Sequence, residues 1–170
     1  HRDLHSFPTR RSSDLVLPTF FKKANAEEIL ATRYDFVIDA IDGVAHKARL
    51  IGMCKQKGIP VITCGAAGGK TDPAAVTIRD LTETIYDPLM AFIRKRLRKW
   101  FQFPRGDRKF GVPCVFSTEQ VFETPPVACE IRAPGVRANC DYGLGAAAHV
   151  TGTFGLVAAG YVVNRIARGG

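Results

Sequence analysis

Two carboxylates follow an apolar run near the start of the chain. In the stretch "DFVIDAIDG", Asp39 comes directly after Phe36–Ile38, and Asp42 follows three positions later. Acids at the C-terminal end of a buried parallel strand lie where α/β proteins bind ligands. Such a carboxylate can hold a magnesium ion shared with nucleotide phosphates, or accept hydrogen bonds from ribose hydroxyls. Lys47 follows five positions after Asp42 and would offer the phosphates a positive charge.

Asp42 has a second interpretation, because it lies two positions before the start of a predicted helix. An acid at that position is a good N-cap, and the sequence supports the cap and the ligand contact equally. Asp39 is the weaker ligand candidate. The loop "GAAGGK", Gly65–Lys70, follows the next predicted strand and should lie at the same edge of the sheet. Its spacing is not that of a phosphate loop, and the chain contains no G-x-G-x-x-G.

A second candidate region is basic. Positions 94 to 109 hold eight Lys or Arg residues against one acid, in a chain whose net charge is +8. Such density suggests contact with the phosphate backbone of RNA, and a solvated helix face is the alternative. The proposed RNA contacts are Arg94, Arg98, Lys99, Arg105 and Arg108. The same segment has an apolar stripe, so we predict that Trp100 belongs to the core and is not a stacking platform for bases.

The cysteines argue against a structural zinc site. The five are Cys54, Cys64, Cys114, Cys129 and Cys140, and no two form a CxxC pair. Their odd number and the lack of a secretory signal predict reduced thiols in the cytoplasm.

The pattern of apolar residues predicts the elements that position these groups. "VLPTFF", from Val16, could form a short strand, and a helix over 26–32 would begin with a capping box of Asn25 and Glu28. Strands are predicted within 35–41, 60–69, 74–81 and 111–122, and helices over 44–57, 87–101 and 146–167. The alternation of strand and helix indicates an α/β domain with a mostly parallel sheet.

The last predicted helix is rich in Ala, Gly and Val. Its unbroken apolar run, 154–163, is about half the length that a membrane span needs, so we predict no membrane span. Small residues allow another backbone to approach closely, which favours a buried helix or one at a subunit interface.

The first fifteen residues, "HRDLHSFPTRRSSDL", have no periodicity. They resemble the translated sequencing-adaptor runs that contaminate assembled reads, and we expect no ordered structure there. We therefore expect the natural chain to extend upstream of Val16.

The rest of the chain resembles a known enzyme family. The motifs "VIDAIDGVAHKA", "GIPVITCGAAGGKTDPAAVTIRDLTETIYDPL", "GVPCVFSTE" and "NCDYGLGAAAHVTGTFG" resemble those of the tRNA threonylcarbamoyladenosine dehydratases. These belong to the ThiF-type adenylating enzymes, a superfamily that includes ubiquitin-activating enzymes. The resemblance implies that residues 16–170 are the C-terminal part of a Rossmann-like domain whose N-terminal nucleotide-binding half is missing.

The resemblance also implies a reaction and its cofactors. Members use ATP and magnesium to activate the carboxylate of threonylcarbamoyladenosine next to the tRNA anticodon, and then close a ring with loss of water. Asp42 matches the family's magnesium and nucleotide aspartate, Lys47 matches a phosphate contact, and Cys140 matches a cysteine suspected of a catalytic role. The implied partners are tRNA, a second copy in a homodimer, and sulfur-transfer proteins.

The chain departs from the family where its phosphate loop should be. That loop, a ribose-binding acid, and an Arg and Lys that grip the triphosphate all lie upstream of the resemblance, so we predict that this chain alone does not bind ATP tightly. Two other functions stay open. One is activation of the C-terminus of a ubiquitin-like sulfur carrier, and the other is a non-catalytic domain that serves dimerisation or binding.

Overall fold

A computed structural model describes residues 16–121 and 145–169. The helices are α1 (Ala26–Ile29), α2 (Val44–Gln56), α3 (Pro88–Phe101) and α4 (Ala148–Ala167), with short 3-10 turns η2 (Pro73–Ala75) and η3 (Leu81–Glu83). The strands are β1 (Val37–Asp39), β2 (Val61–Cys64), β3 (Val76–Asp80) and β4 (Pro113–Ser117). The segment predicted over 16–21 forms no strand, and α1 is shorter than predicted.

The strands form one mostly parallel sheet in the order β1-β2-β4-β3. β1, β2 and β4 run parallel, with Asp39 opposite Thr63 and Thr63 opposite Cys114. β3 pairs with β4 in the antiparallel sense. The α/β class predicted from the sequence is therefore confirmed, and the carboxyl ends of three strands meet at one edge.

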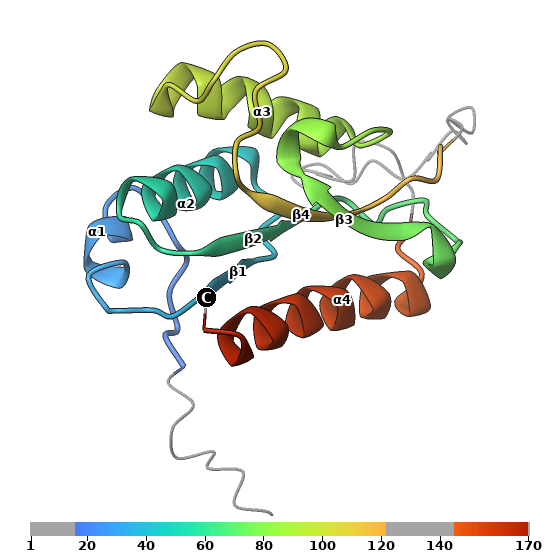
Figure 1. Cartoon of the computed structure of the whole chain (residues 1–170), viewed down its shortest axis with the longest axis horizontal. Helices are drawn as coiled ribbons and strands as arrows, with labels where there is room; N and C mark the ends of the chain where they lie inside the picture. Colours follow the sequence, from blue (N-terminus) through green and yellow to red (C-terminus); the bar gives the residue numbers. More distant parts are fainter. Residues whose placement is uncertain (1–15, 122–144, 170) are drawn as a thin grey trace, which may run out of the picture.

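Helices cover both faces of this sheet, as Figure 1 shows: α2 and α3 lie on one face and α4 lies on the other. Successive strand residues serve the two layers in turn. In β4, Phe116 packs in the cluster with α2 and α3, whereas Val115 packs with α4. In β2, Val61 and Ile62 divide in the same way. Burial on both faces explains why these strands read as continuous apolar runs.

The sequence of α4 is apolar or small on most sides. Its contact with the sheet, and not a polar face in its sequence, determines which residues are buried. Val150, Phe154 and Ala158 are buried against the sheet, whereas Leu156 and Val163 are 77% and 65% exposed. Across the described ranges, no helix has both the length and the apolar character that crossing a membrane requires.

The predicted capping box at the start of α1 is wrong. The Asn25 side chain makes no cap hydrogen bond; it accepts from the Lys22 amide at 2.7 Å and donates to the Phe20 carbonyl oxygen at 2.9 Å. A capping box does form at η3, where the Asp80 carboxylate caps the turn and the Glu83 side chain accepts from the Asp80 amide at 3.1 Å.

Trp100 is also not in the core. Met90, Ile93 and Leu97 are the residues of α3 that are buried, and Trp100 lies beside this stripe with 37% of its surface exposed. The guanidinium carbons of Arg96 and Arg49 lie 5.0 and 5.7 Å from the centroid of its ring. Cations therefore contact the indole at the surface, where the sequence predicted apolar neighbours.

Candidate functional site

The carboxyl ends of β1, β2 and β4 carry the densest set of buried polar groups. Asp39 ends β1 and is fully buried. Its Oδ2 accepts a hydrogen bond from Thr63 Oγ1 at 2.6 Å, and its Oδ1 accepts from the Ile41 amide at 3.0 Å. The carboxylate therefore joins two strands and fixes the turn that leads to Asp42. It is a positioning group and does not reach solvent.

Lys47 is the partner of Asp39. It lies in the first turns of α2, is fully buried, and places its Nζ 3.0 Å from Asp39 Oδ2. This contact neutralises the charge, but its geometry is not that of a hydrogen bond, and Nζ has no hydrogen-bond partner among the described residues. A lysine ammonium has three N–H donors, and leaving them unpaired in the interior is unfavourable.

The preceding residue, His46, shares this feature. Its Nδ1 is buried and also lacks a hydrogen-bond partner among the described residues. Two adjacent side chains at the beginning of α2 thus hold unused polar atoms beside the strand edge. A polar ligand or a further segment of protein at this edge would satisfy them.

Asp42 is placed differently from Asp39. It is exposed, and α2 begins after Gly43, which is the N-cap residue and provides no side-chain cap. The interpretation of Asp42 as the helix cap is therefore wrong. Its carboxylate stands free at the edge, close in the chain to the positive end of a helix, and this arrangement suits contact with a hydrated cation or a hydroxyl group.

The loop after β2 approaches the start of α3 very closely. A Cβ atom at Gly65 would collide with Asp87 Oδ2, so a larger residue fits only if the Asp87 side chain moves. Asp87 caps α3 by accepting from the Met90 amide at 3.0 Å, and its other oxygen accepts from the Ala66 amide at 2.9 Å. One carboxylate therefore fastens the loop to the helix. Aspartate before proline at a predicted helix start is the sequence signal that could have identified it.

Lys70 fastens the end of the same loop. Its buried ammonium donates to the carbonyl oxygens of Tyr86, at 3.1 Å, and of Glu119. Burial lowers the pKa of Lys70, although the nearby Asp87 and Glu119 carboxylates oppose this shift. In the sequence, Lys70 ends a glycine-rich loop, and nothing there indicates this role, because its acceptors are distant backbone atoms.

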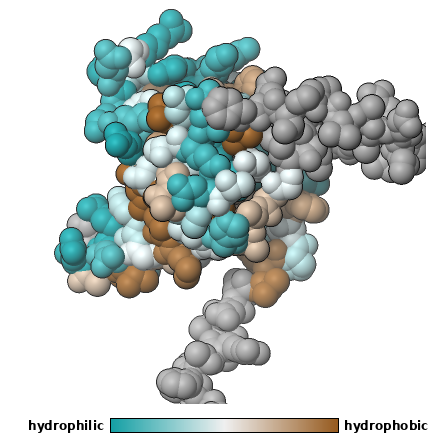
Figure 2. Space-filling model, turned by 90° about the vertical axis from the view of Figure 1, so that its right-hand side faces the viewer, coloured by the Kyte–Doolittle hydropathy of each residue, from teal (hydrophilic) through white to brown (hydrophobic). Residues whose placement is uncertain are grey.

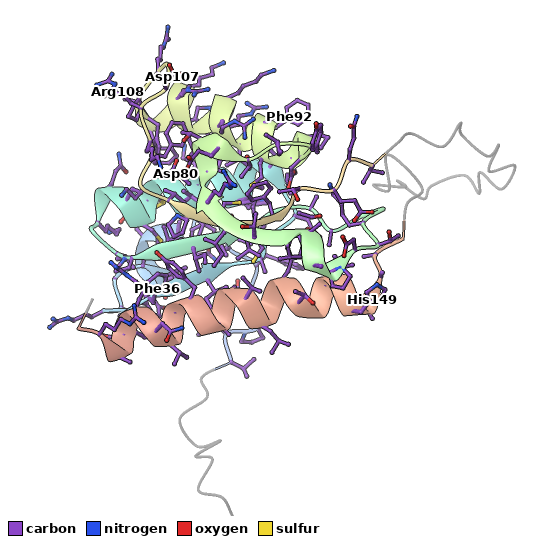
Figure 3. The ribbon with its side chains drawn as sticks, turned by 45° about the vertical axis from the view of Figure 1, so that its right-hand side comes forward. Phe36, Asp80, Phe92, Asp107, Arg108 and His149 are labelled. Atoms are coloured by element: carbon purple, nitrogen blue, oxygen red, sulfur yellow. The ribbon has the colours of Figure 1, made fainter. Side chains whose placement is uncertain are left out.

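Glu119 completes the connection between the loop and β4. Its exposed carboxylate accepts from the amides of Thr71 and Asp72 and from the Thr71 hydroxyl, and the backbone bonds lower its pKa. His149 Nε2 lies 2.9 Å from the Thr71 carbonyl oxygen. Figure 3 shows His149 at the N-terminal end of α4, so this helix also borders the site.

The described cysteines are not activated nucleophiles. Cys54, Cys64 and Cys114 are free thiols, as predicted. Burial raises the pKa of Cys54 to about 11 and also raises the pKa values of Cys64 and Cys114, so all three remain protonated near neutrality. Cys129 and Cys140 lie outside the described residues.

The described residues offer few ligands for the predicted magnesium ion. Within 16–121 and 145–169, no group of three or more His, Cys, Asp or Glu side chains is placed to hold a metal ion. Magnesium commonly binds through one or two carboxylates together with substrate phosphates and water. Asp42 is exposed and can supply one such ligand, whereas Asp39 is occupied by Lys47 and Thr63.

The basic residues proposed to contact RNA divide into two groups. Arg94 is half-buried and donates to the carbonyl oxygens of Leu81 and Thr84, and Arg98 donates to the Pro104 carbonyl oxygen at 3.1 Å. These two arginines bind backbone carbonyl oxygens of the segments before and after α3. Their role in RNA binding stays a prediction. The remaining three are exposed: Lys99, Arg105 and Arg108.

Comparison with known proteins finds one family model and several close relatives. The ThiF family model matches residues 12–168. The tRNA threonylcarbamoyladenosine dehydratase of Haemophilus influenzae is 42% identical over 153 residues, which cover 89% of this chain and 58% of that protein. The Escherichia coli enzyme of the same name is 39% identical over 157 residues, which cover 89% and 59%.

Solved structures agree with this similarity. The crystal structure of the E. coli tRNA N6-threonylcarbamoyladenosine dehydratase superposes with a TM-score of 0.74 at 37% identity, over 89% of this chain and 55% of that one. Its complex with ATP gives 0.71 at 38% identity, over 91% and 58%. The chain thus spans somewhat more than half the length of these relatives.

Proposed function

The chain belongs to the ThiF family, and we propose that it is the C-terminal part of an ATP-dependent tRNA threonylcarbamoyladenosine dehydratase. The observation that carries this proposal is the free carboxylate of Asp42 beside the buried pair of Asp39 and Lys47, at the carboxyl edge of the parallel strands. The two relatives above, each matched over 89% of this chain, carry that enzyme name.

The proposed chemistry begins with a carboxylate, which is a poor electrophile. A carboxylate oxygen of the threonylcarbamoyl group attacks the α-phosphorus of ATP, and pyrophosphate leaves. A nucleophile within the modified nucleoside then attacks the acyl carbon, loses its proton, and expels AMP together with the former carboxylate oxygen. The nucleoside loses one water overall, and ATP ends as AMP and pyrophosphate.

The residues of this chain support particular parts of that reaction. Asp42 would hold a magnesium ion, which offsets charge on the phosphates when it is bound. Asp39 holds the turn before Asp42 through the Ile41 amide, and Lys47 holds Asp39. Lys47 was predicted to touch phosphate; as a buried residue, it acts here through Asp39. Cys140 is kept as a candidate from the family resemblance alone.

The partners also belong to the proposal. An RNA substrate suits the exposed cations Lys99, Arg105 and Arg108 around the C-terminal end of α3. Figure 3 places Arg108 in the loop beyond α3, projecting away from the sheet. A homodimer suits the outward face of α4, where Leu156 and Val163 are exposed. Sulfur-transfer proteins rest on the family resemblance only.

The test is conversion of threonylcarbamoyladenosine in tRNA by the complete enzyme, read as loss of one water by mass spectrometry of the nucleosides. Asp42→Asn in the full-length protein should lower the rate by about 100-fold or more, because a charge-stabilising group is lost. Asp35→Asn is the matched control: this exposed acid precedes the same strand at its opposite end and should leave the rate unchanged. Equal rates for both variants would refute the role of Asp42.

A further inference from the structure

The outer face of α3 combines exposed aromatic rings with cations. Phe92 is 55% exposed, and Lys95 Nζ lies 5.8 Å from the centroid of its ring. Trp100, 37% exposed, is contacted by Arg96 on the same helix and by Arg49 of α2. We call this surface the α3 outer face; its members are Arg49, Phe92, Lys95, Arg96, Lys99 and Trp100.

The charge of this face is of one sign. No Asp or Glu occurs between Asp87 and Asp107, so α3 has no acid within its bounds. Lys95 and Lys99 are separated by four positions, and like charges at that spacing destabilise a helix. An ordinary solvated helix face carries both signs of charge and is stabilised by pairs of opposite charge at this spacing. Figure 2 shows hydrophilic residues gathered at the top of the molecule, the height at which Figure 1 places α3.

The α3 outer face also exposes aromatic rings, which a surface that binds phosphates by charge alone does not need. A single exposed apolar residue on a surface is common. Two aromatic rings on one helix face, each beside a cation, form the combination that binds single-stranded nucleic acid: bases stack on the rings while the cations contact phosphates. Phe92 and Trp100 are eight positions apart, which corresponds to about 12 Å along the helix and about 80° around it. Three to four stacked nucleotides at about 3.4 Å each cover that length.

We propose that the α3 outer face binds unpaired RNA, with Phe92 and Trp100 stacking on bases and Lys95, Arg96 and Lys99 contacting phosphates. On binding, a base replaces one of the two guanidinium groups that lie over Trp100, and the displaced arginine contacts the RNA phosphates. Duplex RNA does not present base faces to such a surface, whereas a single-stranded loop does. The identity of the natural RNA rests on the proposed function; the preference for unpaired bases does not.

Trp100 itself is the reporter for a direct test, since it is the single tryptophan of the chain. The 170-residue chain is titrated with a short oligoadenylate and with a duplex RNA of the same length, and tryptophan fluorescence is followed. Binding is measured in parallel by the anisotropy of labelled RNA. We expect oligoadenylate to quench Trp100, and duplex RNA at equal phosphate concentration to leave its fluorescence largely unchanged.

Substitutions separate stacking from charge. Phe92→Leu should weaken oligoadenylate binding by about fivefold to 100-fold and affect duplex binding little. Phe20→Leu is the matched control, because Phe20 is also exposed and has Lys22 Nζ at 5.8 Å from its ring centroid, but it lies outside α3. Lys99→Gln should weaken binding of both RNAs and reduce the salt dependence by about one charge.

Several results would overturn the proposal. The first two are a failure of oligoadenylate to bind and unchanged Trp100 fluorescence at saturation. A third is an equal effect of Phe92→Leu and Phe20→Leu. A fourth is equal quenching by polyglutamate, which would indicate a surface for acidic protein. The outcome is independent of the enzyme assay above. Quenching with no tRNA conversion would leave the surface standing without the proposed function, and conversion without quenching would do the reverse.

Discussion

Lys47 Nζ lies 3.0 Å from Asp39 Oδ2, and both side chains are closed off from solvent. The ion pair bridges the end of β1 and the first turns of α2. Asp39 also accepts a hydrogen bond from the hydroxyl of Thr63 in the neighbouring strand, so one carboxylate connects β1, β2 and α2. When one member of a buried ion pair is removed, the other is left as an uncompensated charge in the interior, and the folded state is destabilised.

Asp39→Asn should therefore destabilise the protein by about 3–5 kcal/mol, as measured by urea denaturation followed by circular dichroism. Glu27→Gln is the control, since Glu27 pairs with Lys57 at 2.7 Å on the surface and its loss should change the free energy of unfolding by about 0–1 kcal/mol. Similar values for the two variants would contradict the assignment of Asp39 as a structural centre.

Gly65→Ala should destabilise the protein by about 1–3 kcal/mol. The added methyl group meets Asp87 Oδ2, which must move and release the amides of Ala66 and Met90. In contrast, Gly155→Ala should stabilise α4 by about 0.5–1 kcal/mol, because no atom outside the helix backbone lies within 4 Å of the new Cβ. Thermal unfolding of both variants gives the two signs, and a stabilised Gly65→Ala protein would show that the loop and α3 are not in contact.

Asp80 should make stability depend on acid pH. Burial would raise its pKa, but hydrogen bonds from the Thr82 amide and hydroxyl and from the amides of Phe110 and Val112 outweigh burial and lower the pKa below 3.8. The folded state therefore favours the carboxylate. Its contribution is present above about pH 4 and is lost as the pH falls through the folded-state pKa.

The measurement is the urea midpoint of the wild type and of Asp80→Asn between neutral pH and about pH 2.5. The wild type should lose its advantage over the variant as the pH falls below about 4. A difference that stays constant over this range would indicate that Asp80 titrates normally.

ATP should bind weakly to the 170-residue chain. The sequence contains no G-x-G-x-x-G. Of the nucleotide-contact candidates Asp39, Asp42 and Lys47, all within the described residues, Asp42 is exposed and the other two are buried. Isothermal titration should detect no binding at micromolar ATP, with the full-length E. coli enzyme as the positive control. Micromolar affinity in this chain would show that the described edge can hold a nucleotide without a glycine-rich phosphate loop.

The strands and long helices could be predicted from the sequence because their signals are local. A continuous apolar run predicted β1 and β2, and apolar residues three and four positions apart predicted α2 and α3. The failures have equally physical reasons. Asn25 has the type of a capping residue, yet its amide is used by Lys22 and Phe20 instead. Trp100 lies at the border of an apolar stripe, where one helical position decides between core and surface.

The candidate site could be predicted only in outline. That Asp39 and Asp42 lie at the carboxyl edge, where ligands bind in parallel sheets, follows from their position after a predicted strand. That Asp39 is buried and Asp42 is free does not, because it depends on Lys47 and Thr63 reaching the same carboxylate across three elements. Lys70 was equally hidden, since its acceptors are backbone atoms of Tyr86 and Glu119, which lie far along the chain.

The order of strands in the sheet also determines when it can be completed during synthesis. β1, α2 and β2 are neighbours in both chain and space, so this unit can close soon after Cys64 has left the ribosome. β3 is made next, but its partner among the described strands is β4, which is made later and inserts between β2 and β3. Until then the free edge of β2 is open to other chains, and cotranslational folding of this protein is exposed to misassembly for as long as Pro113–Ser117 is missing.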